Sequence, residues 1–365
     1  MLKKHADKVI LITVGILIIL GLAVLASASS EIGKIRFDDP YHYLKHQLTH
    51  GLSFGVVGFL AALLIPYKFF QKAALPMLLL SIVSLILIFS PLGAEFGSAA
   101  RWLEIGPLTM QPSEILKFTF IIYLAAWLAS RYRDRKNDFM EGFFPFMAVS
   151  GIVAVLLILQ PSTSVVVILM LTGLIMYFIN GVRLKYILLL IFIGVLGLCV
   201  VIYFSPYRLE RITSFFNPEA DPLAWGARYH LNQARIAIGS GGLFGVGYGN
   251  SIAKVKFLPE PIGDSIFVVI AEELGFVGAA FFIFMFFTLT TAGFVGSQRI
   301  RDKFGRLAVI GFSSLIAIQV FIHIGSVSGL IPLTGVPLPF ISYGGTAMAT
   351  FMTMIGLTVN LLRNA

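Results

Sequence analysis

Long apolar runs dominate this 365-residue chain. A helix needs roughly 20 apolar residues to cross the hydrocarbon core of a bilayer. Such runs lie at 9–28, 48–66, 73–92, 113–129, 143–160, 163–181, 186–204, 264–294, 307–330 and 339–362. Only 12% of the residues are charged, against about a quarter in soluble domains. The sequence therefore predicts an all-α, polytopic integral membrane protein with about ten transmembrane helices.

The distribution of Lys and Arg predicts the orientation of these spans. Basic residues cluster near the N-terminus, around 68–72, 131–136, 183–185 and 299–306, and at the C-terminal end. Cytoplasmic loops carry such an excess of Lys and Arg, whereas the alternate segments of this chain are rich in acids. We expect a plasma-membrane protein with both termini in the cytoplasm. The net charge of +9 is then a topology signal, so we expect no nucleic-acid partner.

We interpret residues 1–365 as a single transmembrane domain with one large extracellular loop. The loop covers about 205–263, between the seventh and eighth spans, and contains no run of spanning length. Loops this long without regular structure are uncommon and tend to be functional or disordered. Apolar anchors at 236–238 and 243–245 predict that this one is ordered and partly interfacial.

Three carboxylates mark the eighth span. Asp264 precedes the apolar run, whereas Glu272 and Glu273 lie two turns inside it. A charged group near a bilayer centre costs about 3 kcal/mol on insertion scales, so such groups are usually paired or functional. Asp264 has two open interpretations: it caps the helix, or it is a general base at the outer interface, where desolvation raises its pKa.

A buried ion network is the second prediction. Glu114 and Lys117 lie inside the fourth span at i, i+3 spacing and can pair locally. Lys117 is also the expected partner of Glu272 or Glu273. Such a network can be structural, functional or switch-like, and a structural role is the default expectation.

The external segments carry further candidate residues. Arg101 beside Trp102 is typical of an interfacial anchor, and it equally suits a phosphate or sugar. The glycine-rich stretch 238–251 can cradle a phosphate with backbone amides, or it can mark close backbone approach to another element. Basic residues depart from the orientation rule in the long loop and suit an anionic ligand. They are Arg208, Arg211, Arg228, Arg235, Lys254 and Lys256.

Taken together, these stretches resemble the SEDS family of shape, elongation, division and sporulation proteins, which includes FtsW and RodA. The resemblance runs along nearly the whole chain in the family's order. Arg211-Ile-Thr-Ser-Phe and Ala220-Asp-Pro are more similar to FtsW than to RodA. The matching pieces are Arg101-Trp-Leu, Gln111-Pro-Ser-Glu with Lys117, Asp221-Pro, Gly239-Ser-Gly-Gly-Leu-Phe-Gly-Val-Gly, Leu258-Pro-Glu with Asp264, Glu272-Glu-Leu-Gly, and Pro337-Leu-Pro-Phe-Ile-Ser-Tyr-Gly-Gly-Thr.

The resemblance implies a peptidoglycan glycosyltransferase that polymerises lipid II on the outer face of the plasma membrane, in division or elongation. It implies that Asp264 is the essential acidic residue and that its carboxylate deprotonates the acceptor's sugar hydroxyl. A divalent cation, Mg²⁺ or Mn²⁺, is compatible with it. The implied partners are a class B penicillin-binding protein, which is a transpeptidase, and other divisome or elongasome membrane proteins. The implied substrate-binding residues are Arg101, Lys117, Glu260, Arg211, Arg235 and Ser342.

Two positions depart from the family pattern. Gln160-Pro161-Ser162 stands where the family often has Gln-Pro-Asp, and Ile262-Gly263-Asp264 replaces His-Thr-Asp. Two other function classes stay open on sequence alone. Intramembrane carboxylates and prolines suit a flippase for a lipid-linked precursor. A non-catalytic scaffold for a partner transpeptidase would leave Asp264 replaceable.

Overall fold

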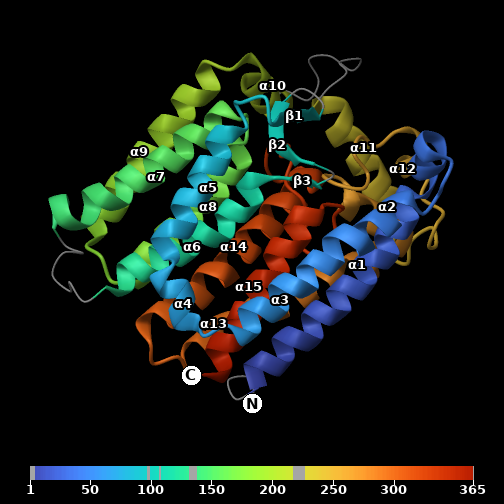
Figure 1. Cartoon of the computed structure of the whole chain (residues 1–365). Helices are drawn as coiled ribbons and strands as arrows, with labels where there is room; N and C mark the ends of the chain where they lie inside the picture. The colour runs from blue at the N-terminus through green and yellow to red at the C-terminus, as the bar shows by residue number, and fades with distance from the viewer. Residues whose placement is uncertain (1–4, 97–98, 107, 131–137, 217–226, 365) are drawn as a thin grey trace.

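A computed structural model describes residues 5–96, 99–106, 108–130, 138–216 and 227–364. The predicted Asp221-Pro match lies outside these residues. The chain forms one elongated bundle of helices with a small sheet at one end (Figure 1). The helices before the long loop are α1 (Ala6–Phe37), α2 (His42–His46), η2 (Gln47–Leu52), α3 (Ser53–Leu64), α4 (Tyr67–Lys72), α5 (Ala74–Leu87), α6 (Pro112–Ala129), η4 (Phe139–Phe143), α7 (Phe144–Leu159), α8 (Thr163–Ile179) and α9 (Leu184–Tyr203). The remaining helices are α10 (Pro206–Phe216), α11 (Ala227–Ser240), α12 (Ala253–Lys256), α13 (Ile266–Ser297), α14 (Lys303–Ser328) and α15 (Gly345–Arg363).

The predicted membrane spans correspond to these helices. Within the described residues, eight helical segments are long and apolar enough to cross a membrane. Two shorter apolar helices, α5 and α8, coincide with the other two predicted spans. The prediction of an all-helical polytopic membrane protein is thus confirmed, and the count of ten is approximate.

The two chain ends lie together at one end of the bundle. The sheet and helices α10 to α12 lie at the opposite end (Figure 1). An even number of crossings produces this arrangement. Pro161 lies between α7, which ends at Leu159, and α8, which begins at Thr163, in the gap between two of the predicted runs.

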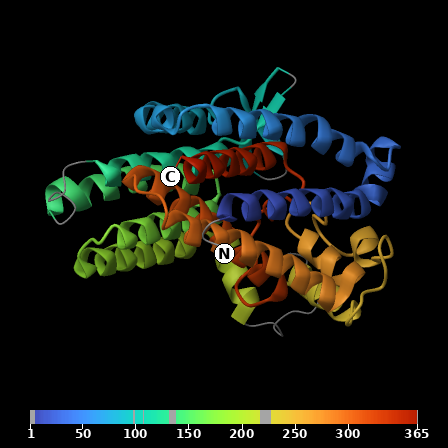
Figure 2. The same ribbon diagram turned by 90° about the horizontal axis from the view of Figure 1, so that it is seen from below.

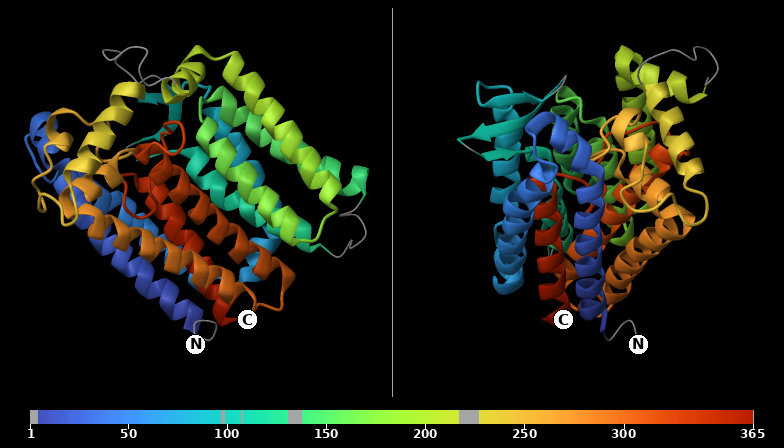
Figure 3. Two further views of the ribbon diagram at one scale, coloured as in Figure 1. Left: turned by 180° about the vertical axis from the view of Figure 1, so that it is seen from behind. Right: turned by 90° about the vertical axis from the view of Figure 1, so that its right-hand side faces the viewer.

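A three-stranded antiparallel sheet forms in the loop between α5 and α6, where the sequence analysis expected no strands. Its strands are β1 (Gly93–Phe96), β2 (Ala99–Ile105) and β3 (Leu108–Met110), in the order β1-β2-β3. The sheet projects beyond the helices in the right-hand view of Figure 3. The strands are short, and their mixture of Gly, Ala and charged residues hides the two-residue alternation that predicts a strand. The sheet holds Arg101 on β2, just before α6.

Helix α13 is central to the packing. It packs against α1 on one side and α14 on another, while α15 packs on α3 (Figure 2). All eight residues from Ile266 to Glu273, in the first two turns of α13, are buried. The N-terminal end of α13, which follows Asp264, is therefore enclosed by the bundle core.

Gly275 breaks α13 into two segments. Its backbone has φ 66° and ψ −166°, which is outside the helical region. A Cβ atom added there would lie 2.3 Å from the amide nitrogen of Gly245 and 2.6 Å from the carbonyl oxygen of Leu243. Only glycine combines this conformation with so close an approach of a second backbone.

We predict that Gly275→Ala destabilises the protein by more than about 1 kcal/mol, because the new methyl group meets both an unfavourable φ and the backbone of Gly245. The measurement is the apparent melting temperature in detergent. Gly194→Ala in α9 is the matched control, since a Cβ there meets nothing within 4 Å. Equal melting temperatures for the two variants would contradict the prediction.

Candidate active site

The loop that carries Asp264 joins α12 to α13 at the end of the bundle opposite the two chain ends. Two residues of the turn before α15 hold it. The Tyr343 amide donates a hydrogen bond to the Ile262 carbonyl at 2.9 Å. The Ser342 hydroxyl donates to the Gly263 carbonyl at 2.8 Å. Because both bonds lie within two residues of Asp264, they fix the backbone that presents its carboxyl group.

Glu260 shapes the same loop through its backbone. It lies between two prolines and has φ 45°, a left-handed conformation that is costly for a residue with a side chain. Its carbonyl accepts hydrogen bonds from the amides of Gly263 and Ser265, each at 3.2 Å. The loop is therefore a tight turn closed on Glu260, and the Glu260 side chain is exposed.

The electrostatic surroundings of Asp264 favour a carboxyl group that titrates near neutrality. The pKa of Asp264 is raised from its ordinary value of 3.8 to about 6, chiefly by burial and then by the charge of Glu260. Arg211 and Arg101 act in the opposite direction on the same pKa. At neutral pH such a carboxyl is mostly ionised, yet it is far more basic than an exposed Asp. This property suits a general base.

Asp264 does not cap α13. The residue at the N-cap position is Ser265, and α13 begins at Ile266. The capping interpretation of Asp264 is therefore wrong. The Asp264 carboxyl lies instead against Gly335, where an added Cβ would come within 2.7 Å of Oδ2. Glycine at 335 leaves room for the carboxyl group.

The segment after Gly335 is held from inside the bundle. His323 Nδ1 lies 2.6 Å from the Val336 carbonyl, and Gln319 Nε2 donates to the Pro337 carbonyl at 2.8 Å. His323 is thus the hydrogen-bonded core histidine that its place in an apolar run suggests. Gln319 in turn accepts from Lys117 at 2.9 Å. Through Gln319, Lys117 is thus connected to the segment 335–337, which lies against the Asp264 carboxyl group.

A buried histidine braces the other side of the loop. His230 on α11 has its Nε2 atom 2.5 Å from the Ser265 hydroxyl, which donates to the Pro259 carbonyl at 2.7 Å. Burial lowers the pKa of His230 to about 4, with a further effect from Arg211, so the ring is neutral at pH 7. The sequence analysis missed His230 because no spacing rule relates a loop histidine to a residue 35 positions away.

The predicted basic residues divide into two groups. Arg101 and Arg211 are half-buried and close enough to Asp264 to lower its pKa. Arg101 donates to the carbonyls of Gln160 and Pro161, and Arg211 donates to the Leu333 carbonyl. By contrast, the Arg235 guanidinium lies at Gly329, the C-cap of α14, and donates a 3.4 Å hydrogen bond to the Gly329 carbonyl.

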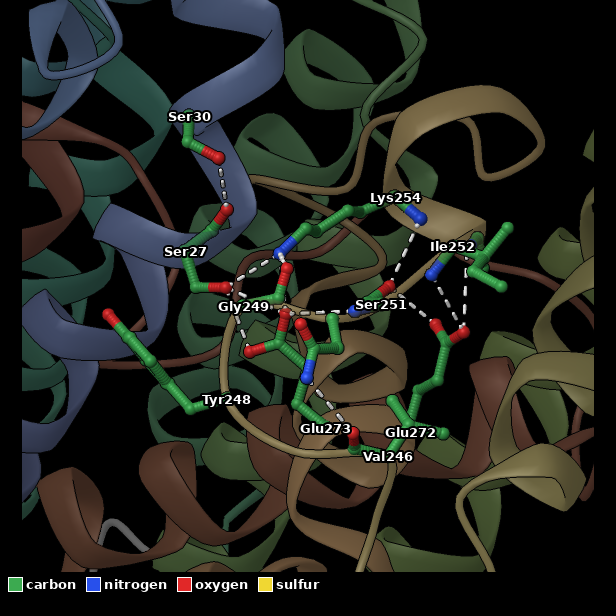
Figure 4. Close-up of polar contacts among 12 residues, drawn as sticks. Ser27, Ser30, Val246, Tyr248, Gly249, Ser251, Ile252, Lys254, Glu272 and Glu273 are labelled. Carbon is green, nitrogen blue, oxygen red and sulfur yellow. Dashed lines mark hydrogen bonds and ion pairs between the residues drawn. The ribbon is translucent and has the colours of Figure 1, made fainter.

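The two carboxylates inside α13 pair with Lys254, and the predicted pairing with Lys117 is wrong. Lys254 Nζ lies 2.6 Å from Glu273 Oε1 and 2.8 Å from the Ser27 hydroxyl on α1 (Figure 4). Glu272 accepts from the Ser251 hydroxyl and from amides at the start of α12. Lys254 is 5% exposed, so it belongs to this cluster and not to an external basic surface.

Glu114 and Lys117 form a separate pair. Their side chains are buried and lie 2.7 Å apart, as the i, i+3 spacing predicts. The predicted single network of Glu114, Lys117, Glu272 and Glu273 is therefore two clusters, one on α6 and α14 and one on α1, α12 and α13. The partners of Glu273, Lys254 and Ser27, lie far from it in the sequence, so a single sequence does not reveal this cluster.

The glycine-rich stretch binds another part of the chain. Val246 and Gly247 donate amide hydrogen bonds to the carbonyls of Glu272 and Glu273, at 3.0 and 3.1 Å. Of the two interpretations, close backbone approach is the one observed, and these two amides are not free to cradle a phosphate.

Comparisons with known proteins identify relatives along nearly the whole chain. A family model described as a cell cycle protein, covering FtsW, RodA and SpoVE, matches residues 7–365. Stage V sporulation protein E of Bacillus subtilis is 33% identical over 362 residues, with 99% of this chain and 98% of that protein covered. A probable peptidoglycan glycosyltransferase FtsW of Saccharophagus degradans is 37% identical over 367 residues, with 99% and 94% covered.

Two solved structures show the same fold. One is a chain from "Structural coordination of polymerization and crosslinking by a peptidoglycan synthase complex", with a TM-score of 0.80, 24% identity, and 97% of each chain covered. The other is the rod shape determining protein RodA of Thermus thermophilus, with a TM-score of 0.72, 23% identity, and 97% and 96% covered.

We predict that Lys254→Met destabilises the protein by about 3–5 kcal/mol, because it leaves the buried Glu273 carboxylate without its cation. Lys254→Met combined with Glu273→Gln should recover most of this loss, since no charge then remains unpaired. Apparent melting temperatures in detergent measure both effects. Lys256→Met, at an exposed position two residues away, is the control. A double variant no more stable than Lys254→Met would refute the pairing.

Proposed function

The chain belongs to the cell cycle protein family of FtsW, RodA and SpoVE, and we propose that it is a peptidoglycan glycosyltransferase acting on lipid II. The observation that carries the proposal is the environment of Asp264. A carboxyl group with a pKa of about 6 lies on a tightly held loop, between the exposed Glu260 and two arginines from separate elements. The relatives named peptidoglycan glycosyltransferase support the reaction class.

In the proposed mechanism, the Asp264 carboxylate takes the proton from the 4-hydroxyl of the acceptor sugar. The oxygen attacks the anomeric carbon of the donor, and the bond to the lipid diphosphate breaks, so that undecaprenyl diphosphate leaves. Arg101 and Arg211 would stabilise the negative charge of the diphosphate. In this mechanism Ser342 and His230 position the loop, since their hydrogen bonds go to Gly263 and Ser265.

A divalent cation, Mg²⁺ or Mn²⁺, was compatible with the sequence resemblance. Asp264 and Glu260 are the carboxylates at the site, and the described residues contain no group of three or more His, Cys, Asp or Glu able to hold a metal. This donor set does not form a metal site by itself. Mg²⁺ that accompanies a diphosphate commonly uses one or two carboxylates together with phosphate oxygens, so Asp264 and Glu260 would be the residues to hold it, and the two arginines would share the charge of the diphosphate.

The proposed setting is the outer face of the plasma membrane, with both termini in the cytoplasm. The proposed partner is a class B penicillin-binding protein, which would supply the transpeptidase. The structural neighbour from a peptidoglycan synthase complex supports a partnered enzyme. Other divisome or elongasome membrane proteins are further proposed partners.

We predict that Asp264→Asn lowers the polymerisation rate by about 10²–10⁴-fold, the usual contribution of a general base. The assay uses purified protein with its partner and lipid II, and glycan chains are resolved on a gel. Asp39→Asn is the matched control, because Asp39 is a carboxylate paired with Lys45 on the linker after α1. Wild-type chain lengths and rates from a folded Asp264→Asn variant would refute the proposal and favour a scaffold. Precursor movement across vesicles without any glycan chains would favour a flippase.

We predict that the rate rises with pH through an apparent pKa of about 6, since Asp264 must lose its proton to act as a base. Glu260→Gln removes a like charge and should shift this acid limb to lower pH. Arg211→Gln removes an opposite charge and should shift it to higher pH. Glu210→Gln, at an exposed position on α10, should leave the limb in place. Shifts of the same sign for Glu260→Gln and Arg211→Gln would contradict the assignment.

A further inference from the structure

The segment from α11 to α12 descends beside α13. His230, near the start of α11, contacts Ser265, immediately before α13. Further along, Gly242 accepts a hydrogen bond from the amide of Phe276 at 2.9 Å. At 1.5 Å per helical residue, Ser265 and Phe276 are separated by about 16 Å along α13. The hairpin of residues 241–249 therefore lies well below the level of Asp264.

Helix α1 provides an independent measure of depth. The Tyr248 hydroxyl donates to the Ala23 carbonyl at 2.7 Å. Lys254 donates to the Ser27 hydroxyl (Figure 4). Both α1 residues belong to the apolar run 9–28. Ala23 lies about 7 Å inside the outer end of that run. A segment that sequence places in an external loop thus contacts α1 at the depth of its membrane-spanning part.

The outward surface of the hairpin is apolar. Leu243 is 65% exposed and Phe244 is 80% exposed. They adjoin Phe276 and Val277 of α13, which are 67% and 53% exposed. The next helical turns of α13 add the exposed side chains of Phe281 and Phe284. The hairpin surface is therefore continuous with the lipid-facing surface of a membrane-spanning helix, and large apolar patches of this kind mark contact surfaces.

The hairpin backbone is also prepared for an apolar environment. Irregular backbone at membrane depth requires internal hydrogen-bond partners. Val246 and Gly247 donate to α13 carbonyls, and the Phe276 and Val277 amides donate to the carbonyls of Gly242 and Leu243. These four bonds satisfy polar groups of the hairpin and of the broken helix at once.

We propose that residues 241–249 form a re-entrant hairpin whose tip, Leu243 and Phe244, contacts the acyl chains of the outer leaflet. Lipid is the occupant we argue for, because the hairpin contacts α1 within its apolar run and its backbone amides are satisfied inside the chain, as a hydrocarbon environment requires. Arg235, at the C-cap of α14, lies two helical turns above the tip, where its guanidinium can reach the interface. Contact of the hairpin with lipid does not depend on which reaction the Asp264 site performs.

The single cysteine of the chain allows a direct test. In a Cys199→Ser background, Phe244→Cys is labelled with the environment-sensitive fluorophore NBD, and the full-length protein is reconstituted into phosphatidylcholine vesicles. Doxyl-labelled lipids and aqueous iodide serve as quenchers. Phe284→Cys on α13 is the lipid-facing control. Lys34→Cys, exposed at the outer end of α1 beyond the apolar run, is the aqueous control.

We expect quenching of the label at 244 by doxyl lipids to lie within about twofold of the Phe284→Cys control, with iodide having little effect, as for an inserted apolar surface. Quenching by iodide at the level of Lys34→Cys, with no effect of doxyl lipids, would overturn the proposal. Protection from iodide that arises only when a partner protein is added would also overturn it and would assign the tip to a protein interface. Leu243→Cys repeats the measurement at a second tip position.

Discussion

The break in α13 at Gly275 is the feature on which the outer half of the molecule depends. A broken membrane helix loses backbone hydrogen bonds, and unsatisfied polar groups are costly in an apolar environment. The hairpin of residues 241–249 supplies the missing partners through the carbonyls of Gly242 and Leu243. The same contact brings Lys254 to Glu273, and α1 joins through Ser27. Backbone and ionic contacts thus hold the segment that leads directly into the Asp264 loop.

The Asp264 loop is held from several directions by contacts of different kinds. Ser342 and Tyr343 bind its backbone, His230 braces Ser265, and Gly335 makes room for the carboxyl group. A loop held in this way keeps the Asp264 carboxyl group in a half-buried position. The raised pKa of Asp264 is therefore a consequence of the fold around it.

The sequence predicted the spans, the gap between the runs 143–160 and 163–181, and the local Glu114–Lys117 pair, because each depends on residues close together in the chain. It did not predict that Lys254, placed in an external loop, is the partner of Glu273, since that pairing needs the hairpin to descend along α13. His230, Gly335 and the small sheet were missed for the same reason. Asp264 was identified by its position before an apolar run and by family resemblance, and the predicted roles of the other substrate-binding residues stay predictions.

The carboxylates of α13 and its loop differ in what remains available to a substrate. Glu273 is neutralised by Lys254, and Glu272 is occupied by the Ser251 hydroxyl and the first amides of α12. Glu114, on α6, is matched by Lys117. Asp264 is different, because the arginines that influence it come from β2 and α10 and are also engaged with backbone carbonyls. A diphosphate entering between Arg101 and Arg211 would weaken their stabilisation of the Asp264 carboxylate and so raise its basicity. Substrate binding would then strengthen the base at the step that needs it, which a buried, fully paired carboxylate such as Glu273 cannot do.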